Sequence, residues 1–203
     1  MGVFVVFEGV EGSGKTTQSR ALERRIARTG RAVILVHEPG GTPVADRIAR
    51  LLKSGPDIGP LDELLLFSAA RASLITSVVR PALKRDATVV CDRYIYSTLA
   101  YQGYGRGLPL ETVRKLNGIA TGNLVPDLIV LLDLEPKQGL GRIVDRPLDR
   151  IEQEGDDFHQ RVRNGYLEVA SDHPERWLVL DGALSAARLS ESVWSRVSKM
   201  LRV

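Results

Sequence analysis

A glycine-rich segment near the start of the chain has the residue types that bind a row of phosphates. The segment that fits G-x-x-x-x-G-K-[S/T] at every fixed position is Gly9-Val10-Glu11-Gly12-Ser13-Gly14-Lys15-Thr16, with Thr17 next. Glycines let the backbone wrap an anion with its N–H groups aimed inward, and a helix beginning there adds a favourable dipole. Lys15 reaches the transferring phosphates and the Thr16 hydroxyl can ligate Mg²⁺. This phosphate loop (Gly9–Thr16) predicts a nucleoside triphosphate with Mg²⁺; the alternative is a glycine-rich turn without a ligand.

An acidic and a basic residue follow the apolar run Thr88–Cys91. Asp92, at the end of a predicted buried strand, is placed to hold Mg²⁺ beside the phosphate loop, often through water. Arg93 can clamp a second phosphate with two parallel hydrogen bonds. A purely structural ion pair is the alternative for these two residues.

The elements that must position these residues follow a simple alternation. Nearly continuous apolar runs, typical of strands buried on both faces, occur at Val3–Phe7, Ala32–Val36, Thr88–Cys91, Leu128–Leu132 and Trp177–Leu180. Helical patterns lie between them, including Gln18–Thr29, which Gly30 ends. We therefore expect a three-layer α/β fold, with a five-stranded parallel sheet flanked by helices and the ligand at the carboxyl ends of the strands.

Residues 141–157 do not fit a core element. This segment is dense in charge, contains Pro147 and Gly155, and has few apolar anchors. Such a stretch has little to bury and belongs to the mobile part of a structure. It is interpreted either as a solvated loop or as a mobile lid that closes over phosphates.

Length and composition limit the classes of protein. The chain has 203 residues, 43% of them hydrophobic and 26% charged, which predicts one folded domain over residues 1–203. The single Cys91 excludes an internal disulfide framework and points to a reducing compartment, the cytoplasm. The N-terminus lacks the pattern of a signal peptide, and Leu61–Val79 is interpreted as too short and too charged to span a membrane. With a net charge of +3, the basic row Arg20, Arg24, Arg25, Arg28 and Arg31 is weak support for nucleic-acid binding, which we do not expect.

Further motifs extend from end to end of the chain. They are Phe7–Thr17, Glu38-Pro39-Gly40-Gly41-Thr42-Pro43, Leu66–Arg71, Asp92-Arg93-Tyr94, Ser97-Thr98, Ala100–Gly107, Pro126-Asp127-Leu128, Asp149–Glu152 and Phe158–Tyr166. With these, the chain resembles the bacterial thymidylate kinases, a family of nucleoside monophosphate kinases with the P-loop kinase fold. The resemblance implies transfer of the γ-phosphoryl group of ATP to dTMP, with Mg²⁺, in a cytoplasmic homodimer.

The resemblance also implies roles for residues of the acceptor site. Phe67 resembles the platform on which the pyrimidine ring stacks, and Arg71, one helical turn later, would reach the edge of the base. Arg93 would bind the monophosphate, and Tyr101 would pack under the deoxyribose and exclude a 2′-hydroxyl. The remaining residues implied for this site are Glu11 and Glu38 at the sugar and phosphate end, Ser97 and Thr98 beside the thymine, and Gln102 as an orienting side chain.

The phosphate loop lacks the arginine that some family members carry there, so a second cation must come from elsewhere. The candidates are lid arginines: we expect Arg146 first, then Arg142, with Arg150 tied to Glu152. Val144 and Asp145 stand where another basic residue is usual in the family. His37 and Ala49 also replace common basic residues, which predicts that the acceptor phosphate is held somewhat differently.

Two other functions stay open from the sequence. A kinase for another nucleoside monophosphate would keep the same phosphate loop and differ in the acceptor it prefers. A regulatory P-loop ATPase would hydrolyse ATP without an acceptor, and the set Phe67, Arg71 and Tyr101 would then have no purpose.

Overall fold

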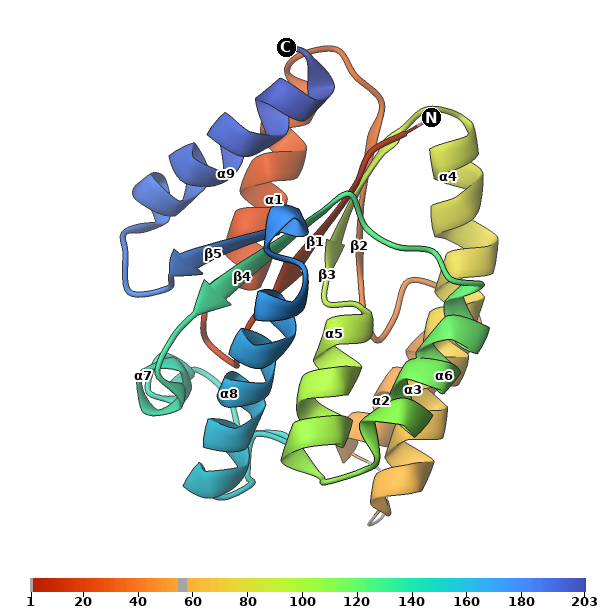
Figure 1. Ribbon diagram of the computed structural model, residues 1–203, viewed down its shortest axis with the longest axis vertical. Helices are drawn as coiled ribbons and strands as arrows, with labels where there is room; N and C mark the ends of the chain where they lie inside the picture. The colour runs from red at the N-terminus through yellow and green to blue at the C-terminus, as the bar shows by residue number, and fades with distance from the viewer. Residues whose placement is uncertain (1, 55–57) are drawn as a thin grey trace.

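The computed structural model describes residues 2–54 and 58–203 and contains a parallel sheet with the strand order β2-β3-β1-β4-β5 (Figure 1). The strands are β1 (Phe4–Glu8), β2 (Val33–His37), β3 (Thr88–Asp92), β4 (Leu128–Asp133) and β5 (Trp177–Asp181). They coincide with the five predicted runs to within one residue, so the expected parallel sheet is confirmed. Burial on both faces is correct for β1 and β3, whereas the edge strands β2 and β5 are partly exposed, as Leu35 and Val179 show.

Helices cover both faces of this sheet (Figure 1). The face with Val5, Phe7 and Val130 packs against α1 (Lys15–Ala27) and α9 (Ala186–Leu201). The opposite face packs against a larger set of helices, two of which are π-helical. They are α3 (Pro60–Leu74), the π-helix η1 (Ile75–Val79), α4 (Arg80–Lys84), α5 (Ile95–Thr98), the π-helix η2 (Leu99–Gly105), α6 (Leu110–Thr121) and α8 (Asp156–Asp172). The three expected layers are therefore present. The remaining elements are α2 (Pro43–Ser54), which lies against α3, the short α7 (Pro136–Leu140), and the 3-10 turn η3 (Pro174–Arg176).

The helix that follows the phosphate loop begins earlier than the apolar pattern suggested. Helix α1 starts at Lys15, three residues before the predicted start, because Gly14 adopts a left-handed conformation (φ 96°) and caps it. Lys15 and Thr16 are therefore part of the first helical turn, whose N–H groups and dipole face the carboxyl edge of the sheet.

One helical stretch departs from the sequence-based interpretation. Helices α3 and α4 join through η1 into a run of 25 residues, Pro60–Lys84, which by length and composition alone could cross a membrane, so the argument that it is too short was wrong. This is weak support for a membrane helix, since a core helix of a folded domain passes the same test. Here Leu64, Leu74 and Val79 are buried against the sheet layer, and Glu63 and Arg71 form buried ion pairs.

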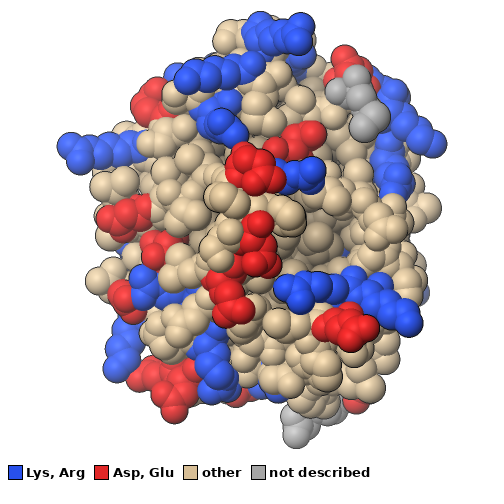
Figure 2. Space-filling model, in the orientation of Figure 1, with Lys and Arg blue, Asp and Glu red and all other residues tan. Residues whose placement is uncertain are grey.

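The carboxyl edge of the sheet brings the predicted polar residues together. Parallel registers pair Phe7 with Asp92 and Asp92 with His37, so the segments that follow β1, β2 and β3 leave the sheet side by side. Acidic and basic side chains are interspersed on the face seen in Figure 2, in keeping with the small net charge of +3.

Candidate active site

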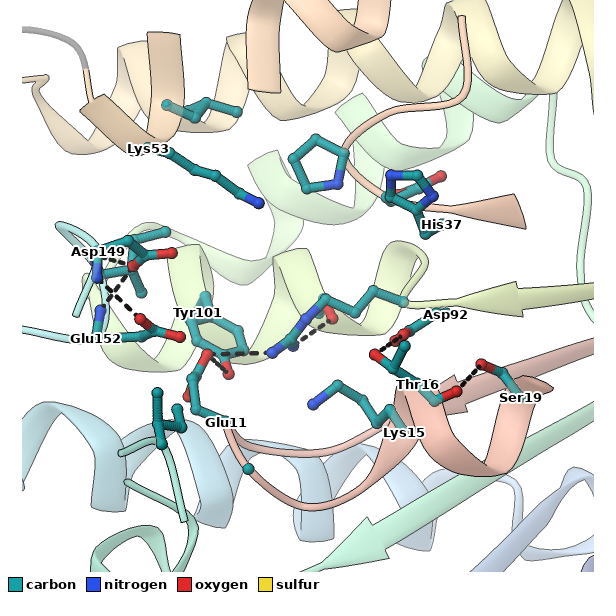
Figure 3. A pocket seen from close by; sticks show the side chains of 18 of the residues that line it. Glu11, Lys15, Thr16, Ser19, His37, Lys53, Asp92, Tyr101, Asp149 and Glu152 are labelled. Atoms are coloured by element: carbon teal, nitrogen blue, oxygen red, sulfur yellow. Dashed lines mark hydrogen bonds and ion pairs between the residues drawn. The ribbon is translucent and has the colours of Figure 1, made fainter. Parts of the chain in front are cut away.

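A cavity of about 800 Å³ opens at the carboxyl edge of the sheet. Its lining comes from the phosphate loop, the ends of β2 and β3, helices α2 and α3, η2, and residues 142–152 of the lid segment. In Figure 3, Glu11 and Lys15 form one side of the cavity, Lys53 extends into it from α2 opposite them, and the lid residues Asp149 and Glu152 lie at one end. Residues that are far apart in the sequence therefore line the same cavity.

The ammonium group of Lys15 lies inside the phosphate loop. Its Nζ donates to the carbonyl of Val10 at 2.7 Å and to Ser13 Oγ at 3.3 Å, and the side chain is buried. Burial lowers the pKa of Lys15 to about 8, and the nearby Arg93 acts in the same direction. The carboxylates of Asp92, Glu11 and Glu8 only partly offset this effect, and a bound phosphate would stabilise the charged form further.

The two residues predicted to hold a metal are in direct contact. Thr16 Oγ1 donates to Asp92 Oδ2 at 2.6 Å, so a hydroxyl and a carboxylate meet beside the phosphate loop (Figure 3). Among residues 2–54 and 58–203, no group of three or more His, Cys, Asp or Glu side chains forms a metal cluster. One hydroxyl and one carboxylate fit Mg²⁺ bound with phosphates, because Mg²⁺ keeps waters and takes substrate oxygens rather than needing a protein cage.

Arg93 projects into the cavity from a strained backbone position directly after β3. Its φ of 70° is left-handed, and its guanidinium donates to Glu11 Oε1 at 3.1 Å and to the Gly9 carbonyl at 3.2 Å. Tyr101, over which Arg93 stacks, donates its hydroxyl to the same Glu11 oxygen at 2.5 Å. Burial alone would raise the pKa of Glu11, but Arg93, Lys15 and the Tyr101 hydrogen bond together lower it. Glu11, Arg93 and Tyr101, all predicted from the sequence, are therefore connected by hydrogen bonds and one ion pair.

Arg71 and Glu38 form a second, fully buried pair at the other end of the cavity. Arg71 Nε donates to Glu38 Oε2 at 2.7 Å, and its terminal nitrogens donate to Asn117 Oδ1 and to the Tyr94 carbonyl. These bonds use three of the five guanidinium N–H groups, so two remain for another acceptor. Burial raises the pKa of Glu38 to about 7 despite Arg71, and its Oε1 has no partner among the described residues.

The other residues expected at the acceptor site lie along the same wall. Phe67 and Thr98 line the cavity, and the Thr98 hydroxyl is buried without a hydrogen-bond partner among the described residues. Ser97 and Gln102 also line it, but the Ser97 hydroxyl and the Gln102 amide nitrogen already have protein partners. Ser97 Oγ donates to Glu8 Oε2 at 2.6 Å, and Gln102 Nε2 donates to Glu63 Oε1 at 2.7 Å. Thr98 is therefore the hydroxyl left available at this point.

The lid arginines lie differently from the expectation. Arg146, not Arg150, pairs with Glu152, through two hydrogen bonds of 2.6 and 2.7 Å, so the expected Arg150–Glu152 pair was wrong. Arg150 instead donates to the buried carboxylate of Glu63 and does not line the cavity. Arg142 lines the cavity and donates to the carbonyls of Gly12 and Gly182, each at 3.2 Å. Arg142 and Arg146 are the two of the three that reach the cavity.

Comparisons with known proteins show the family of the chain. The family model described as Thymidylate kinase matches residues 7–193. The chain belongs to the thymidylate kinase family. A thymidylate kinase of Dehalococcoides mccartyi is 49% identical over 205 residues, covering 100% of this chain and 99% of that protein, and one of Deinococcus radiodurans is 48% identical over 200 residues, covering 98% and 97%. The crystal structure of thymidylate kinase from Ehrlichia chaffeensis superimposes with a TM-score of 0.80 at 30% identity, covering 97% of this chain and 98% of that one.

Two residues of this family member, one that lines the cavity and one buried next to it, were not found from the sequence. Lys53 on α2 extends into the space, one turn after Ala49 (Figure 3). Glu8 is fully buried behind Arg93 and accepts from Ser97 and Tyr166. The sequence signal for Lys53 is its position four residues after Ala49, where a basic residue is common in the family.

A buried histidine also escaped the sequence analysis. His159 of α8 is 1% exposed, neither of its ring nitrogens has a partner among the described residues, and Nδ1 lies 3.8 Å from Glu11 Oε2. No sequence signal separates such a histidine from one that simply fills a core.

Proposed function

We propose that this chain transfers the γ-phosphoryl group of ATP to dTMP, giving dTDP and ADP. The observation that carries this is a single cavity lined both by the phosphate loop, with Lys15 and Thr16, and by Arg93, Phe67 and Tyr101 of the acceptor wall. A cavity with both sets allows two phosphate chains to meet end to end. Its volume of about 800 Å³ is within the range of small-molecule sites.

Positioning and charge neutralisation account for the chemistry. The acceptor phosphate oxygen attacks the γ-phosphorus of ATP, the bond to the bridging oxygen breaks, and ADP leaves, with no covalent enzyme intermediate. Lys15 binds the donor phosphates from the loop, and Arg93 exchanges its contact with Glu11 for the acceptor phosphate. Arg146 and Arg142 supply the additional cations from the lid, which covers the site and excludes water.

The acceptor wall fits a thymine deoxynucleotide. Phe67 provides a stacking face, and the unpartnered Thr98 hydroxyl together with the two unused N–H groups of Arg71 can read the edge of the ring. Tyr101 is buried and tied to Glu11, so its ring is a fixed surface under the sugar that leaves no room for a 2′-hydroxyl.

Magnesium is the cofactor we propose for this site. Thr16 and Asp92 would hold it beside the phosphate loop, where Mg²⁺ neutralises the charge that develops on the phosphates. The substrate phosphates and waters complete its shell.

The assembly and location that we propose follow from the family and from one apolar face. The chain acts as one kinase domain over residues 1–203, with residues 141–157 as its mobile lid, in the cytoplasm and without nucleic acid or membrane as partners. It forms a homodimer through α2 and α3, which expose Val44, Leu51, Leu61 and Leu65. Of the basic row on α1, Arg25 is already paired with Glu191 at 2.6 Å and stacked on Trp194, which disfavours a free surface for nucleic acid.

A panel of acceptors tests the proposed reaction. With ATP and Mg²⁺, dTMP is expected to be phosphorylated in preference to dUMP, dCMP, AMP and GMP, and hydrolysis without an acceptor is expected to be slow. Preference for another nucleotide would replace the substrate, and rapid hydrolysis with no acceptor would favour a regulatory ATPase.

Arg93→Ala is expected to lower kcat/KM for dTMP by at least about 10³-fold, because the acceptor phosphate loses the cation proposed to bind it. Arg25→Ala, which removes a surface arginine of α1, serves as the matched control and is expected to leave kcat/KM unchanged. Near-normal transfer by Arg93→Ala, with a thermal midpoint close to wild type, would refute the role of Arg93.

A further inference from the structure

A buried carboxylate joins the lid to the acceptor wall. Glu63 of α3 is 0% exposed, and its two oxygens accept hydrogen bonds from three side chains of other elements. Gln102 of η2 donates at 2.7 Å, Arg106 just after η2 donates to both oxygens at 3.3 Å, and Arg150 of the lid donates to Oε2. Arg106 also donates to Glu154 of the lid at 2.5 Å. The lid is thus tied to the wall at two points.

The position of Glu63 on its helix relates it to the acceptor site. Glu63, Phe67 and Arg71 follow each other at intervals of four on α3, so they share one face of the helix. Gln102, on the opposite side of the carboxylate, directly follows Tyr101 in η2. Glu63 and its partner Gln102 are therefore direct neighbours of residues proposed to bind the acceptor.

The charges in this cluster balance when all four members are present, and removal of any single one leaves a net charge. Glu63 and Glu154 carry two negative charges, and Arg106 and Arg150 carry two positive charges. A buried carboxylate retains its charge at tolerable cost only when it is paired and hydrogen-bonded, and removal of one partner leaves the other charge buried. The lid is therefore held against the acceptor wall in the arrangement that pairs these carboxylates with Arg106 and Arg150.

We propose that Glu63 is a positioning residue that seats the lid on the acceptor wall through Arg150, so that the lid arginines Arg142 and Arg146 lie over the cavity. The contact between Glu63 and Arg150, which we call the seat, does not depend on the proposed function. Only its catalytic consequence rests on that function. Arg150 acts in it as an anchor of the lid rather than as a cation at the phosphates, in keeping with its absence from the cavity lining.

Hydrogen–deuterium exchange of the ligand-free protein tests the seat without any reaction. The readout is the exchange rate of backbone amides in residues 141–155, compared for wild type, Glu63→Gln, Arg150→Gln and Arg150→Lys. Lys137→Gln is the control, because it removes a pair at the base of the lid, Lys137–Asp156, whose side chains are exposed. Arg150 lies on the lid and is 20% exposed, so its variants keep the test available if Glu63→Gln does not fold.

Loss of the seat is expected to speed exchange in the lid about tenfold in Glu63→Gln and Arg150→Gln, because the segment then opens more often. Arg150→Lys, which keeps the charge, is expected to recover part of the protection, and Lys137→Gln to match wild type. The double variant Glu63→Gln/Arg150→Gln is expected to be no faster than the faster single variant, since each single change already removes the ion pair between Glu63 and Arg150. Unchanged lid exchange in Arg150→Gln, or effects that multiply in the double variant, would overturn the proposal.

Steady-state measurements then test the catalytic consequence. Arg150→Gln is expected to lower the ratio of dTMP phosphorylation to ATP hydrolysis about tenfold, while KM for ATP stays within about twofold. A fall in kcat with an unchanged ratio would contradict positioning of the lid. If lid exchange rises as expected but no variant or wild-type protein phosphorylates dTMP, the seat stands and the proposed function fails.

Discussion

At the scale of single residues, the buried ammonium of Lys15 has the most direct consequence for activity. Its pKa is lowered to about 8, chiefly by burial, so the free protein loses this proton as the pH rises through 8. A neutral lysine cannot attract the donor phosphates, whereas bound phosphates favour the charged form and raise the pKa.

We therefore expect kcat/KM for ATP, which reports the free enzyme, to fall on the alkaline side with an apparent pKa of about 8, and the fall in kcat to be displaced to higher pH. Rates measured between about pH 7.5 and 9 at saturating dTMP check this, because the dTMP phosphate ionises below that range and the thymine N3–H above it. A flat kcat/KM across that range would contradict the assignment.

Lys53 is the candidate for the cation that is missing at Ala49. It lies one helical turn further along α2 and extends into the cavity, where it is not expected from the family pattern (Figure 3). Lys53→Ala is expected to raise KM for dTMP about fivefold to tenfold and to leave KM for ATP unchanged, because a cation near an anionic substrate contributes about 1 kcal/mol. Lys84→Ala, at an exposed site on α4, is the control. Equal effects of Lys53→Ala on both KM values would refute an acceptor-specific role.

The sequence predicted those site residues that belong to local motifs. Lys15, Thr16, Asp92 and Arg93 could be found because strand, loop and helix follow one another within a few positions, and local geometry fixes where their side chains project. Glu63 and His159 could not be found, because a lone acid or histidine in a helical pattern has no signature until distant elements pack around it.

At the scale of elements, the five strands were predictable because short, nearly continuous runs rich in Val, Ile and Leu are typical of strands in a parallel sheet. The lid was predictable as a charged segment, but its ion pairs were not. Arg146 and Arg150 lie four positions apart and both have Glu152 within reach in sequence, and only the fold brings Glu63 to Arg150. Spacing therefore settles neither the pairing within the lid nor the pairing to α3, because both depend on how the lid packs against the rest of the chain.

The lid segment contains two arginines whose surroundings differ. Arg146 lines the cavity, is half exposed and can exchange Glu152 for a phosphate, while Arg150 is tied to a buried carboxylate. Arg146→Ala is expected to lower kcat about 10²-fold or more with little change in KM for dTMP, because its charge acts on the developing charge of the transferring group. Pre-steady-state phosphoryl transfer measures this. Normal transfer by Arg146→Ala together with loss in Arg142→Ala would assign the role to Arg142.

At the scale of the whole molecule, helix α3 has two unlike faces. One face lines the cavity with Phe67 and Arg71, and the outward positions Leu61 and Leu65 are 52% and 46% exposed. On the adjoining α2, Val44 and Leu51 are exposed seven positions apart, so the two helices present neighbouring apolar stripes. An exposed apolar face of this kind is typical of a subunit interface.

A dimer through this face would connect the two active sites, because the helix buried between subunits is the one proposed to bind the base. Sedimentation velocity at micromolar concentration is expected to give twice the 22.3 kDa chain mass for wild type and one chain mass for Leu65→Glu, which buries a charge in the interface. Ile119→Glu, at a 70% exposed site on α6, is the control and is expected to remain dimeric. In the monomeric variant KM for dTMP is expected to rise, since α3 loses the packing that fixes Phe67. A wild-type monomer, or a Leu65→Glu dimer, would exclude α2 and α3 as the interface and leave the base site dependent on the fold of one chain alone.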